Sequence, residues 1–395
     1  MKERIDVVDV FLKIGFQKER LKHMPPFPYH KVVTDDDLSE FNKSDLNSSN
    51  FSERKLVFGL ENLSNQVLNI DYAILLAKLG VKLTISKAIK FYQSRFLLSW
   101  VEMCSKARAN AATNGDTASV KLIKLLVNSV YGKFLEQRRG KSEFKIVNNI
   151  NTQMNIFRNP LLKSFCAISP HIMIVEMKSP KVNINRPLAV GCSILDNAKC
   201  IMNSFYYGTV EARFGIGNCP VNYIDTDSLI LQLPGKTRDE AIGRIVDKLD
   251  TSNYPVNHKF YSNSNTKKTF YFKDELAGED IALFCGIRAK VYAILTKNEL
   301  IEKRSKSKFV KMKGVCNEMG QQLGPFSYLF NLIDQIEYSG KIGKFSCKNH
   351  VIHLTEIVKK CLVNKDTKIR ILNCGIHLKE YGEKCDNNCN LCNLH

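Results

Sequence analysis

Two aspartates, Asp225 and Asp227, lie in the string Y-I-D-T-D-S at residues 223–228, with apolar residues on both sides. The flanking patterns predict strands at 220–225 and 228–233, which places the aspartates at the tip of a hairpin. Two carboxylates this close repel each other unless cations or solvent offset the repulsion. Bound Mg²⁺ does so in sites that transfer phosphoryl or nucleotidyl groups. A bare Asp-x-Asp is typical of an ordinary turn, but the complete string favours a metal site.

A second set of polar side chains lies at residues 124–133. On a helix, Lys124, Asn128 and Tyr131 stand at positions i, i+4 and i+7 and share one face. A cation, an amide and an aromatic ring suit a nucleotide, with lysine at the phosphates and tyrosine for stacking. Gly132 destabilises a helix by about 1 kcal/mol relative to Ala. A reason to have glycine there is that, without a side chain, it lets a base or the backbone approach closely. An amphipathic helix with a polar stripe is the alternative.

Two basic segments follow. Residues 281–296 are predicted to form one strand, on which Arg288, Lys290 and Tyr292 alternate onto one face and could follow a phosphate backbone. Residues 303–314 contain six basic residues and no acidic one, with Lys311 and Lys313 among them. Beside a nucleotide site, contact with phosphates is the favoured interpretation. A solvated strand face and a flexible basic loop are the alternatives.

Three cysteines and a histidine lie close together at the end of the sequence: Cys385, Cys389, Cys392 and His395. Zinc commonly takes four such ligands, although Cys-x2-Cys pairs usually flank a longer loop. Two interpretations stay open. One is a Zn²⁺ site, for which Cys374 and His377 are substitute ligands, and the other is a solvated tail.

The charge balance points to a polyanionic partner. The 395 residues include 58 Lys+Arg against 39 Asp+Glu, a net charge of +19, and nucleic acid is the commonest partner of such a chain. A hydrophobic fraction of 44% excludes a wholly disordered chain. No apolar run approaches the ~20 residues of a membrane span. The N-terminus does not resemble a secretory signal, and the 13 cysteines are mostly scattered, so an intracellular, reducing location without a membrane partner is expected.

Hydrophobic periodicity predicts the elements that must position these residues. Residues 24–55 are expected to be irregular. An α+β arrangement on an antiparallel sheet is expected, with a helical hairpin before it. Helices are predicted at 64–79, 87–109, 117–137, 192–213, 237–249, 323–337 and 354–363. Strands are predicted at 81–85, 142–148, 166–176, 187–191, 220–225, 228–233, 268–273 and 281–296.

Together these motifs resemble those of the family B DNA polymerases. Residues 223–228 are similar to the palm motif C, Y-x-D-T-D-S, and residues 124–132 to the fingers motif B, K-x3-N-S-x-Y-G. Residues 290–292 are similar to the K-x-Y motif that grips the primer terminus. The order of the three motifs also fits, and the resemblance covers roughly residues 15–330.

Three further segments resemble the protein-primed branch of this family, residues 249–255, 272–275 and 311–315. Within that branch the likeness is greatest to polymerases of Polinton (Maverick) elements and adintovirus-like viruses, which residues 91–94 and 193–199 also resemble. It implies replication of a viral or mobile element at a nuclear or viral replication site. The implied partners are primer–template DNA, dNTPs and a terminal priming protein.

The resemblance also implies residue roles in a DNA-directed DNA polymerase. A primer 3′-hydroxyl would attack the α-phosphate of a dNTP, assisted by two Mg²⁺. The implied sets are, for catalysis and Mg²⁺, Asp225 and Asp227; for nucleotide binding, Lys124, Asn128, Tyr131 and Tyr223; and for DNA binding, Gly132, Arg288, Lys290, Tyr292, Lys311 and Lys313.

The family's motif A, D-x-x-S-L-Y-P, is not found, since neither Asp6 nor Asp9 is followed by Ser-Leu-Tyr-Pro. The exonuclease carboxylates are not found either. The chain is therefore expected to be the C-terminal portion of a polymerase, weakly active or inactive by itself. The alternatives are a catalytically dead DNA-binding remnant, a metal-free basic scaffold and a reverse transcriptase, although Thr226 separates the carboxylates that a reverse transcriptase has adjacent.

A right-hand polymerase core is expected, with an antiparallel palm sheet, helical fingers and a helical thumb. The predicted limits are an irregular, insertion-like region at 1–60, fingers at 61–140, palm at 141–300, thumb at 301–384 and a Cys-rich tail at 385–395. Residues 1–60 and parts of 141–185 would correspond to the insertions that hold the terminal protein.

Overall fold

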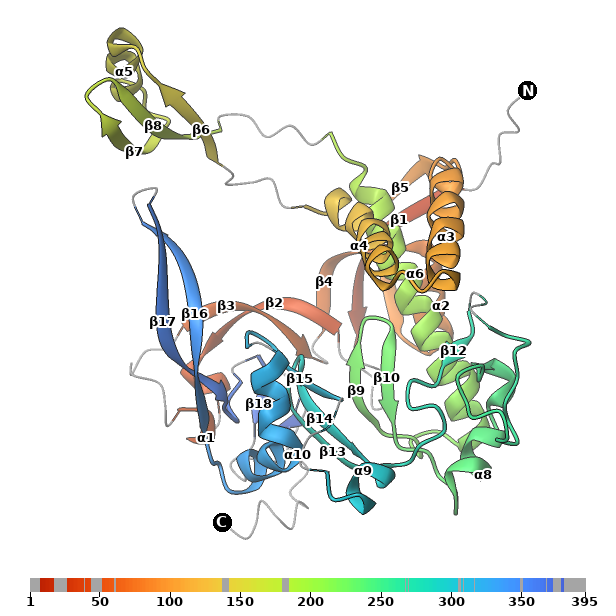
Figure 1. Cartoon of the computed structure of the whole chain (residues 1–395). Helices are drawn as coiled ribbons and strands as arrows, with labels where there is room; N and C mark the ends of the chain where they lie inside the picture. The colour runs from red at the N-terminus through yellow and green to blue at the C-terminus, as the bar shows by residue number, and fades with distance from the viewer. Residues whose placement is uncertain are drawn as a thin grey trace. The chain divides into compact units, whose positions relative to one another are not determined.

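The computed structural model describes residues 8–17, 27–38, 40–43, 52–59, 62–136, 142–179, 185–266, 268, 270–304, 307, 309–315, 317–348, 351–366, 368–371 and 378–379. These residues form helices and small, mostly antiparallel sheets, which confirms the α+β class (Figure 1). They divide into two compact units, each described by itself. The first unit lies within Met1–Asp9, Lys90–Asp196 and Gly343–Ile357, and the second within Val10–Ile89, Asn197–Ile342 and Val358–His395. The right-hand arrangement and the domain limits stay predictions.

A helical hairpin occupies the first unit. Helices α3 (Leu98–Thr113) and α4 (Thr117–Phe134) pack against each other. Gly115 between them has a φ of 72°, which glycine adopts without steric cost. The Asp116 carboxylate then accepts the Ser119 N–H at 3.0 Å and caps α4. These two local signals explain why the predicted helical hairpin is found.

A three-stranded sheet with one short helix is also part of the first unit. Its strands are ordered β6-β8-β7, and its buried residues are Val147, Met173, Val175 and Met177, against which Ile156 of the helix packs. The prediction of one strand at 166–176 is wrong, because the chain turns between β7 and β8, and α5 was not predicted. The bounds are β6 Ser142–Val147, α5 Ile150–Phe157, β7 Leu162–Ser169 and β8 Ile172–Lys178.

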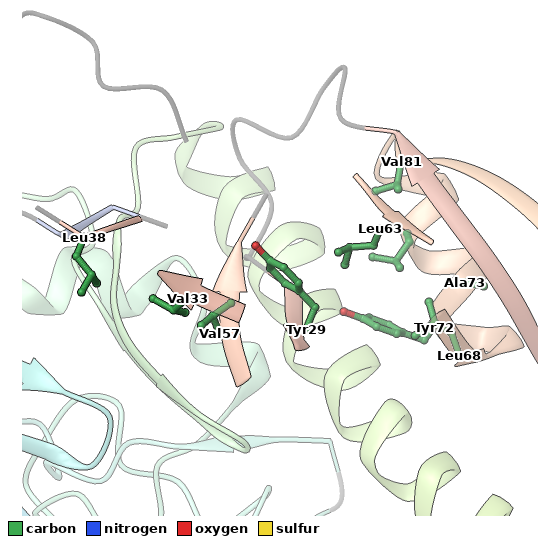
Figure 2. Close-up of a cluster of buried hydrophobic side chains, with 10 residues drawn as sticks. Tyr29, Val33, Leu38, Val57, Leu63, Leu68, Tyr72, Ala73 and Val81 are labelled. Carbon is green, nitrogen blue, oxygen red and sulfur yellow. The ribbon is translucent and has the colours of Figure 1, made fainter. Parts of the chain in front are cut away.

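The second unit begins with a sheet ordered β4-β1-β5 and with the pair β2–β3. Figure 2 shows the apolar core of this region, to which α2 contributes Tyr72 and Ala73, β2 contributes Val33, and β3 contributes Val57. The expectation of irregular structure in residues 1–60 is therefore wrong for the segments that form strands β1, β2 and β3. The bounds are β1 Val8–Gln17, β2 Phe27–Thr34, a 3₁₀ turn Asp35–Asp37, α1 Glu40–Lys43, β3 Ser52–Gly59, β4 Leu63–Asn69, α2 Ile70–Lys78 and β5 Lys82–Tyr92.

Two predicted helices begin later than the apolar spacing indicates. The segment 64–79 is strand β4 up to Asn69, because this strand pairs with β1. The Asn69 side chain accepts the Asp71 N–H at 2.9 Å and thereby starts α2. The segment 87–109 is strand β5 up to Tyr92, since it also pairs with β1, and helix α3 starts only at Leu98.

Helix α6 (Leu188–Phe205) leads into a π-helical turn, Tyr206–Glu211, and the short α7, Ala212–Phe214. The predicted strand at 187–191 is wrong, because the helix starts directly after Pro187, a residue that fits the first turn of a helix. The predicted helix at 237–249 ends early, at Gly243. The next elements are β9 Val221–Asp225, β10 Ser228–Leu231, α8 Arg238–Gly243, a 3₁₀ turn Val246–Lys248, β11 Leu249–Asp250 and β12 Phe272–Lys273.

A sheet ordered β13-β14-β15 completes the second unit together with α10. Its core includes Ile287, Val291, Met312 and Tyr328. The segment 281–296 is a hairpin, not one strand, and 354–363 belongs to a strand, not a helix. Residues 301–384 are thus not mainly helical where they are described. The bounds are β13 Ile281–Arg288, β14 Val291–Thr296, α9 Lys297–Ile301, β15 Val310–Met312, α10 Asn317–Ile333, β16 Tyr338–Lys348, β17 Val351–Leu362, β18 Arg370–Ile371 and β19 Leu378–Lys379.

Candidate nucleotidyl-transfer site

The hairpin β9–β10 carries both aspartates at its tip. Asp225 pairs with Ser228, which leaves Thr226 and Asp227 as the turn. Thr226 has a φ of 57°, and the Asp227 N–H donates to the Asp225 carbonyl oxygen at 2.6 Å. A turn of this kind, closed between residues i and i+2 with a positive φ, is rare and strained, and backbone strain concentrates at functional sites. Asp227 is exposed and the Asp225 side chain is 33% exposed, so both carboxylates are accessible.

Lys290 reaches this tip from the turn between β13 and β14. Its ammonium nitrogen Nζ lies 2.9 Å from Oδ2 and 3.2 Å from Oδ1 of Asp225. Its main-chain N–H donates to the Tyr223 hydroxyl at 2.8 Å, and its carbonyl accepts the Lys313 N–H at 3.0 Å. The hydrogen bond and the charge of Asp225 raise the pKa of the Lys290 ammonium. The main-chain N–H and the side chain of Lys290 therefore both bond to residues of the β9–β10 hairpin, Tyr223 and Asp225.

Three aromatic rings lie near one another in the same region, those of Tyr223, Phe284 and Tyr292. The centroids of Tyr223 and Tyr292 are 4.7 Å apart, and Phe284 lies 6.4 Å from Tyr223 and 6.2 Å from Tyr292. Burial raises the pKa of the Tyr223 hydroxyl; the Lys290 N–H opposes this and the charge of Asp225 adds to it. Burial also raises the pKa of Tyr292, with smaller contributions from Tyr223 and Asp225. Both hydroxyls thus stay protonated and able to donate.

Phe284 was missed by sequence reasoning. Gly286 stands opposite Tyr292 in the β13–β14 register, and a Cβ at Gly286 would lie 2.9 Å from the Phe284 ring. The missing side chain at Gly286 therefore makes room for Phe284 beside Tyr292. The sequence does contain a signal for this contact. Residues 284 and 286 are two positions apart, and residues with this separation lie on the same face of a strand.

The basic residues of this region are arranged differently from the prediction. Lys290 lies in a turn with a φ of 61°, so Arg288, Lys290 and Tyr292 do not alternate along one strand. Lys311 pairs with Tyr292 across β14–β15 and is exposed, as is Lys313. Lys359, which sequence reasoning also missed, donates to the Gly314 carbonyl at 2.9 Å. Strand β15 and the turn after it thus each carry one exposed lysine, Lys311 and Lys313, and Lys313 bonds to Lys290.

Residues 249–255 and 272–275, which both resemble the protein-primed branch, contact each other at Asp274. Its Oδ2 accepts the Tyr254 hydroxyl at 2.6 Å and the Gly278 N–H at 3.1 Å, and it forms an ion pair with Arg238. The Asn253 amide donates to the Asp274 carbonyl at 2.6 Å. Burial is the largest single influence and disfavours the Arg238 cation, but the charges and hydrogen bonds of Asp274 and Tyr254 together outweigh it and raise the Arg238 pKa. The carboxylate is saturated with donors, which indicates a structural role.

The residues that resemble motif B lie on α4, in the first unit. Lys124, Asn128 and Gly132 are exposed and Tyr131 is half-buried, with the helical spacing that places them on one face. Asp225 and Asp227 belong to the second unit.

The metal predictions have different outcomes. Asp225 and Asp227 offer carboxylate oxygens, the ligands that Mg²⁺ prefers. The described part of the chain contains no group of three or more His, Cys, Asp or Glu side chains arranged around a metal. The tail residues Cys385, Cys389, Cys392 and His395 lie outside the described residues, as do Cys374 and His377, so the zinc prediction stays a prediction. Among the described residues, no helix is long and apolar enough to cross a membrane.

Residues 1–187 match the family described as DNA polymerase type B, organellar and viral. This supports a relationship with family B DNA polymerases for a part of the chain that includes α4 and ends before the β9–β10 hairpin. Neither the curated proteins nor the solved structures contain a significant match.

Proposed function

We propose that this chain is the C-terminal catalytic portion of a DNA-directed DNA polymerase, a nucleotidyltransferase that adds dNTPs to a primer 3′-hydroxyl. The observation that carries the proposal is the strained tip with Asp225 and Asp227, tied to Lys290 and the ring pair of Tyr223 and Tyr292. The family match over residues 1–187, which contain motif B, supports it independently.

In this proposal Asp225 and Asp227 would hold Mg²⁺, and the bound ion would supply neutralisation of charge on the phosphate and activation of the 3′-hydroxyl. The 3′-hydroxyl loses its proton to solvent, its oxygen forms a bond to the α-phosphorus of the dNTP, and the bond between the α-phosphorus and the bridging oxygen breaks, so that pyrophosphate leaves. Lys290 and Tyr292 hold the primer end, while Arg288, Lys311 and Lys313 contact backbone phosphates. On α4, Lys124 contacts the dNTP phosphates, and Gly132 lets the DNA approach.

The carboxylates of Asp225 and Asp227 supply some, but not all, of the protein ligands expected for a catalytic Mg²⁺ site. This ion is commonly held by one or two carboxylates together with waters and substrate phosphates, which the two aspartates satisfy. A third carboxylate of the motif A kind is not among the described groups that could surround a metal. Weak incorporation by the chain alone is therefore expected.

The finer assignments belong to the same proposal. They are the protein-primed branch, with replication of a Polinton-like or viral element at a nuclear or viral replication site, and a terminal protein as partner. The right-hand division into fingers at 61–140, palm at 141–300 and thumb at 301–384 is proposed on the order of the motifs. The strings around Asn253 and Asp274 support the branch.

The alternative is a catalytically dead DNA-binding remnant of such a polymerase. The ion pair between Lys290 and Asp225 favours it, because an ammonium occupies oxygens that a metal ion needs. Both functions predict binding of primer–template DNA by this basic chain, with an affinity that falls as salt rises.

Primer extension separates the two functions. The purified chain is incubated with a labelled primer–template, dNTPs and Mg²⁺ or Mn²⁺, beside Asp227→Ala. We expect weak incorporation that the variant lacks, with DNA binding of the two proteins equal in fluorescence anisotropy. DNA binding with no incorporation above the variant would establish the remnant, and failure to bind DNA would overturn both functions. Robust incorporation lost in Asp227→Ala would refute only the expected weakness.

A further inference from the structure

The carboxylate of Asp225 is already paired with a positively charged side chain. The Lys290 ammonium contacts both of its carboxylate oxygens, at 2.9 and 3.2 Å. These are the oxygens that the proposed function assigns to a divalent cation. An ammonium and a divalent cation on the same carboxylate repel each other, so the lysine and a metal ion compete for Asp225.

The main chain of Lys290 is fixed independently of this ion pair. The Tyr223 hydroxyl accepts its N–H, and the Lys313 N–H donates to its carbonyl oxygen. The Lys290 side chain is 58% exposed and has four rotatable bonds. The ammonium can therefore leave Asp225 while its Cα stays beside motif C, and an exposed ion pair of this kind is weak enough to be exchanged.

We propose that Lys290 is an exchangeable counter-ion of Asp225. It neutralises the carboxylate while no divalent cation is bound, and it is released when the cation binds. The released ammonium is then available to a phosphate at the primer end. It stays near the site because the Lys290 main-chain N–H remains bonded to the Tyr223 hydroxyl. This inference rests on the proposed function, because it requires a divalent cation at Asp225.

A coupling between two ligands follows. The divalent cation frees Lys290 for the primer, and a primer phosphate that engages Lys290 frees Asp225 for the cation. Each ligand must therefore raise the affinity for the other by the same factor. Because the exchange involves one exposed ion pair, a factor of about two to five is expected.

Mn²⁺ binding, followed by electron paramagnetic resonance on the full chain, tests the exchange without turnover. The variant is Lys290→Met, which keeps the length of the side chain and removes its charge. The control is Lys313→Met, which removes one charge from the neighbouring turn. Without DNA, Lys290→Met should bind Mn²⁺ about two to five times more tightly than the wild type, and Lys313→Met should change the affinity less. Adding primer–template should tighten Mn²⁺ binding in the wild type and not in Lys290→Met.

The other outcomes are distinguishable. Mn²⁺ binding that is lost in Asp227→Asn but unchanged in Lys290→Met overturns the exchange and leaves the proposed function intact. An equal gain in both lysine variants shows a general charge effect and also overturns the exchange. Mn²⁺ binding that Asp225→Asn and Asp227→Asn do not weaken overturns the proposed function together with the exchange. Far-UV circular dichroism of each variant checks that the fold is unchanged.

Discussion

The Asp225 site and the α4 face differ in what holds their side chains in place. At the Asp225 site, a strand, two turns and a neighbouring sheet contribute residues that bond to one another, such as the Tyr223 hydroxyl and the Lys290 N–H. On α4, Lys124 and Asn128 are exposed side chains of one helix, whose position depends mainly on the helix itself. The first arrangement fixes its groups relative to one another through bonds between elements, while the second displays its groups on the surface of one helix. Substitutions in the two regions should therefore have different kinds of effect.

The largest effect on stability is expected where the second unit buries a charge. Asp274→Ala should lower the free energy of unfolding by about 3 kcal/mol, because it leaves the half-buried Arg238 cation without its carboxylate. Urea denaturation measures this. The control is Glu275→Ala, an exposed neighbour that should stay within about 0.5 kcal/mol of the wild type. Equal losses in both variants would contradict the structural role of Asp274.

Two glycines should respond with opposite signs. Gly286→Ala should destabilise by about 1–2 kcal/mol, because the new Cβ meets the Phe284 ring at 2.9 Å. Gly132→Ala should stabilise α4 by up to about 1 kcal/mol, since a Cβ there has no neighbour within 4 Å. Thermal unfolding of both variants gives the signs. A neutral Gly286→Ala would mean that the Phe284 ring moves away at little cost.

Lys124→Ala should act on a ligand and not on the fold. If Lys124 contacts dNTP phosphates, the variant should raise the KM for dNTP about tenfold, because hydrogen bonds to charged groups contribute about 1.5–3 kcal/mol. Lys121→Ala removes an exposed lysine one turn earlier on the same helix and is the control. Single-nucleotide incorporation gives both KM values. Indistinguishable KM values would remove the α4 face from the proposed nucleotide site.

The smallest effect is expected from Glu176 in the first unit and appears only in acid. Lys163 at 2.6 Å and Ser164 at 2.8 Å, with Ser142, lower the Glu176 pKa from 4.5 to about 2. The ionised carboxylate therefore stabilises the fold fully above pH 4.5, and this stabilisation is lost as the pH falls towards 2. Glu176→Gln should show a weaker loss of stability in that window than the wild type. Glu143→Gln, on β6, should follow the wild type in the same acid titration by circular dichroism.

What the sequence predicted correctly depends on neighbours along the chain. Helix α4 follows from its cap at Asp116, and the β9–β10 hairpin follows from alternation around Asp225 and Asp227. The failures depend on distant partners. Strands β4 and β5 pair with β1, and β17 pairs with β16, so sheet formation overrides the helical spacing of the apolar residues in β4, in the second part of β5 and in β17. The turn position of Lys290 and the place of Phe284 also follow from strand register, which spacing alone does not give.

The ion pair between Lys290 and Asp225 joins residues 65 positions apart, which has a consequence for how the protein is made. At about 5–20 residues per second, a ribosome adds the intervening segment in about 3–13 s. During this interval the nascent chain contains the two aspartates but not yet the lysine that balances one of them. Native pairing at the tip is therefore a late event of biosynthesis, completed only after the β13–β14 turn has left the ribosome.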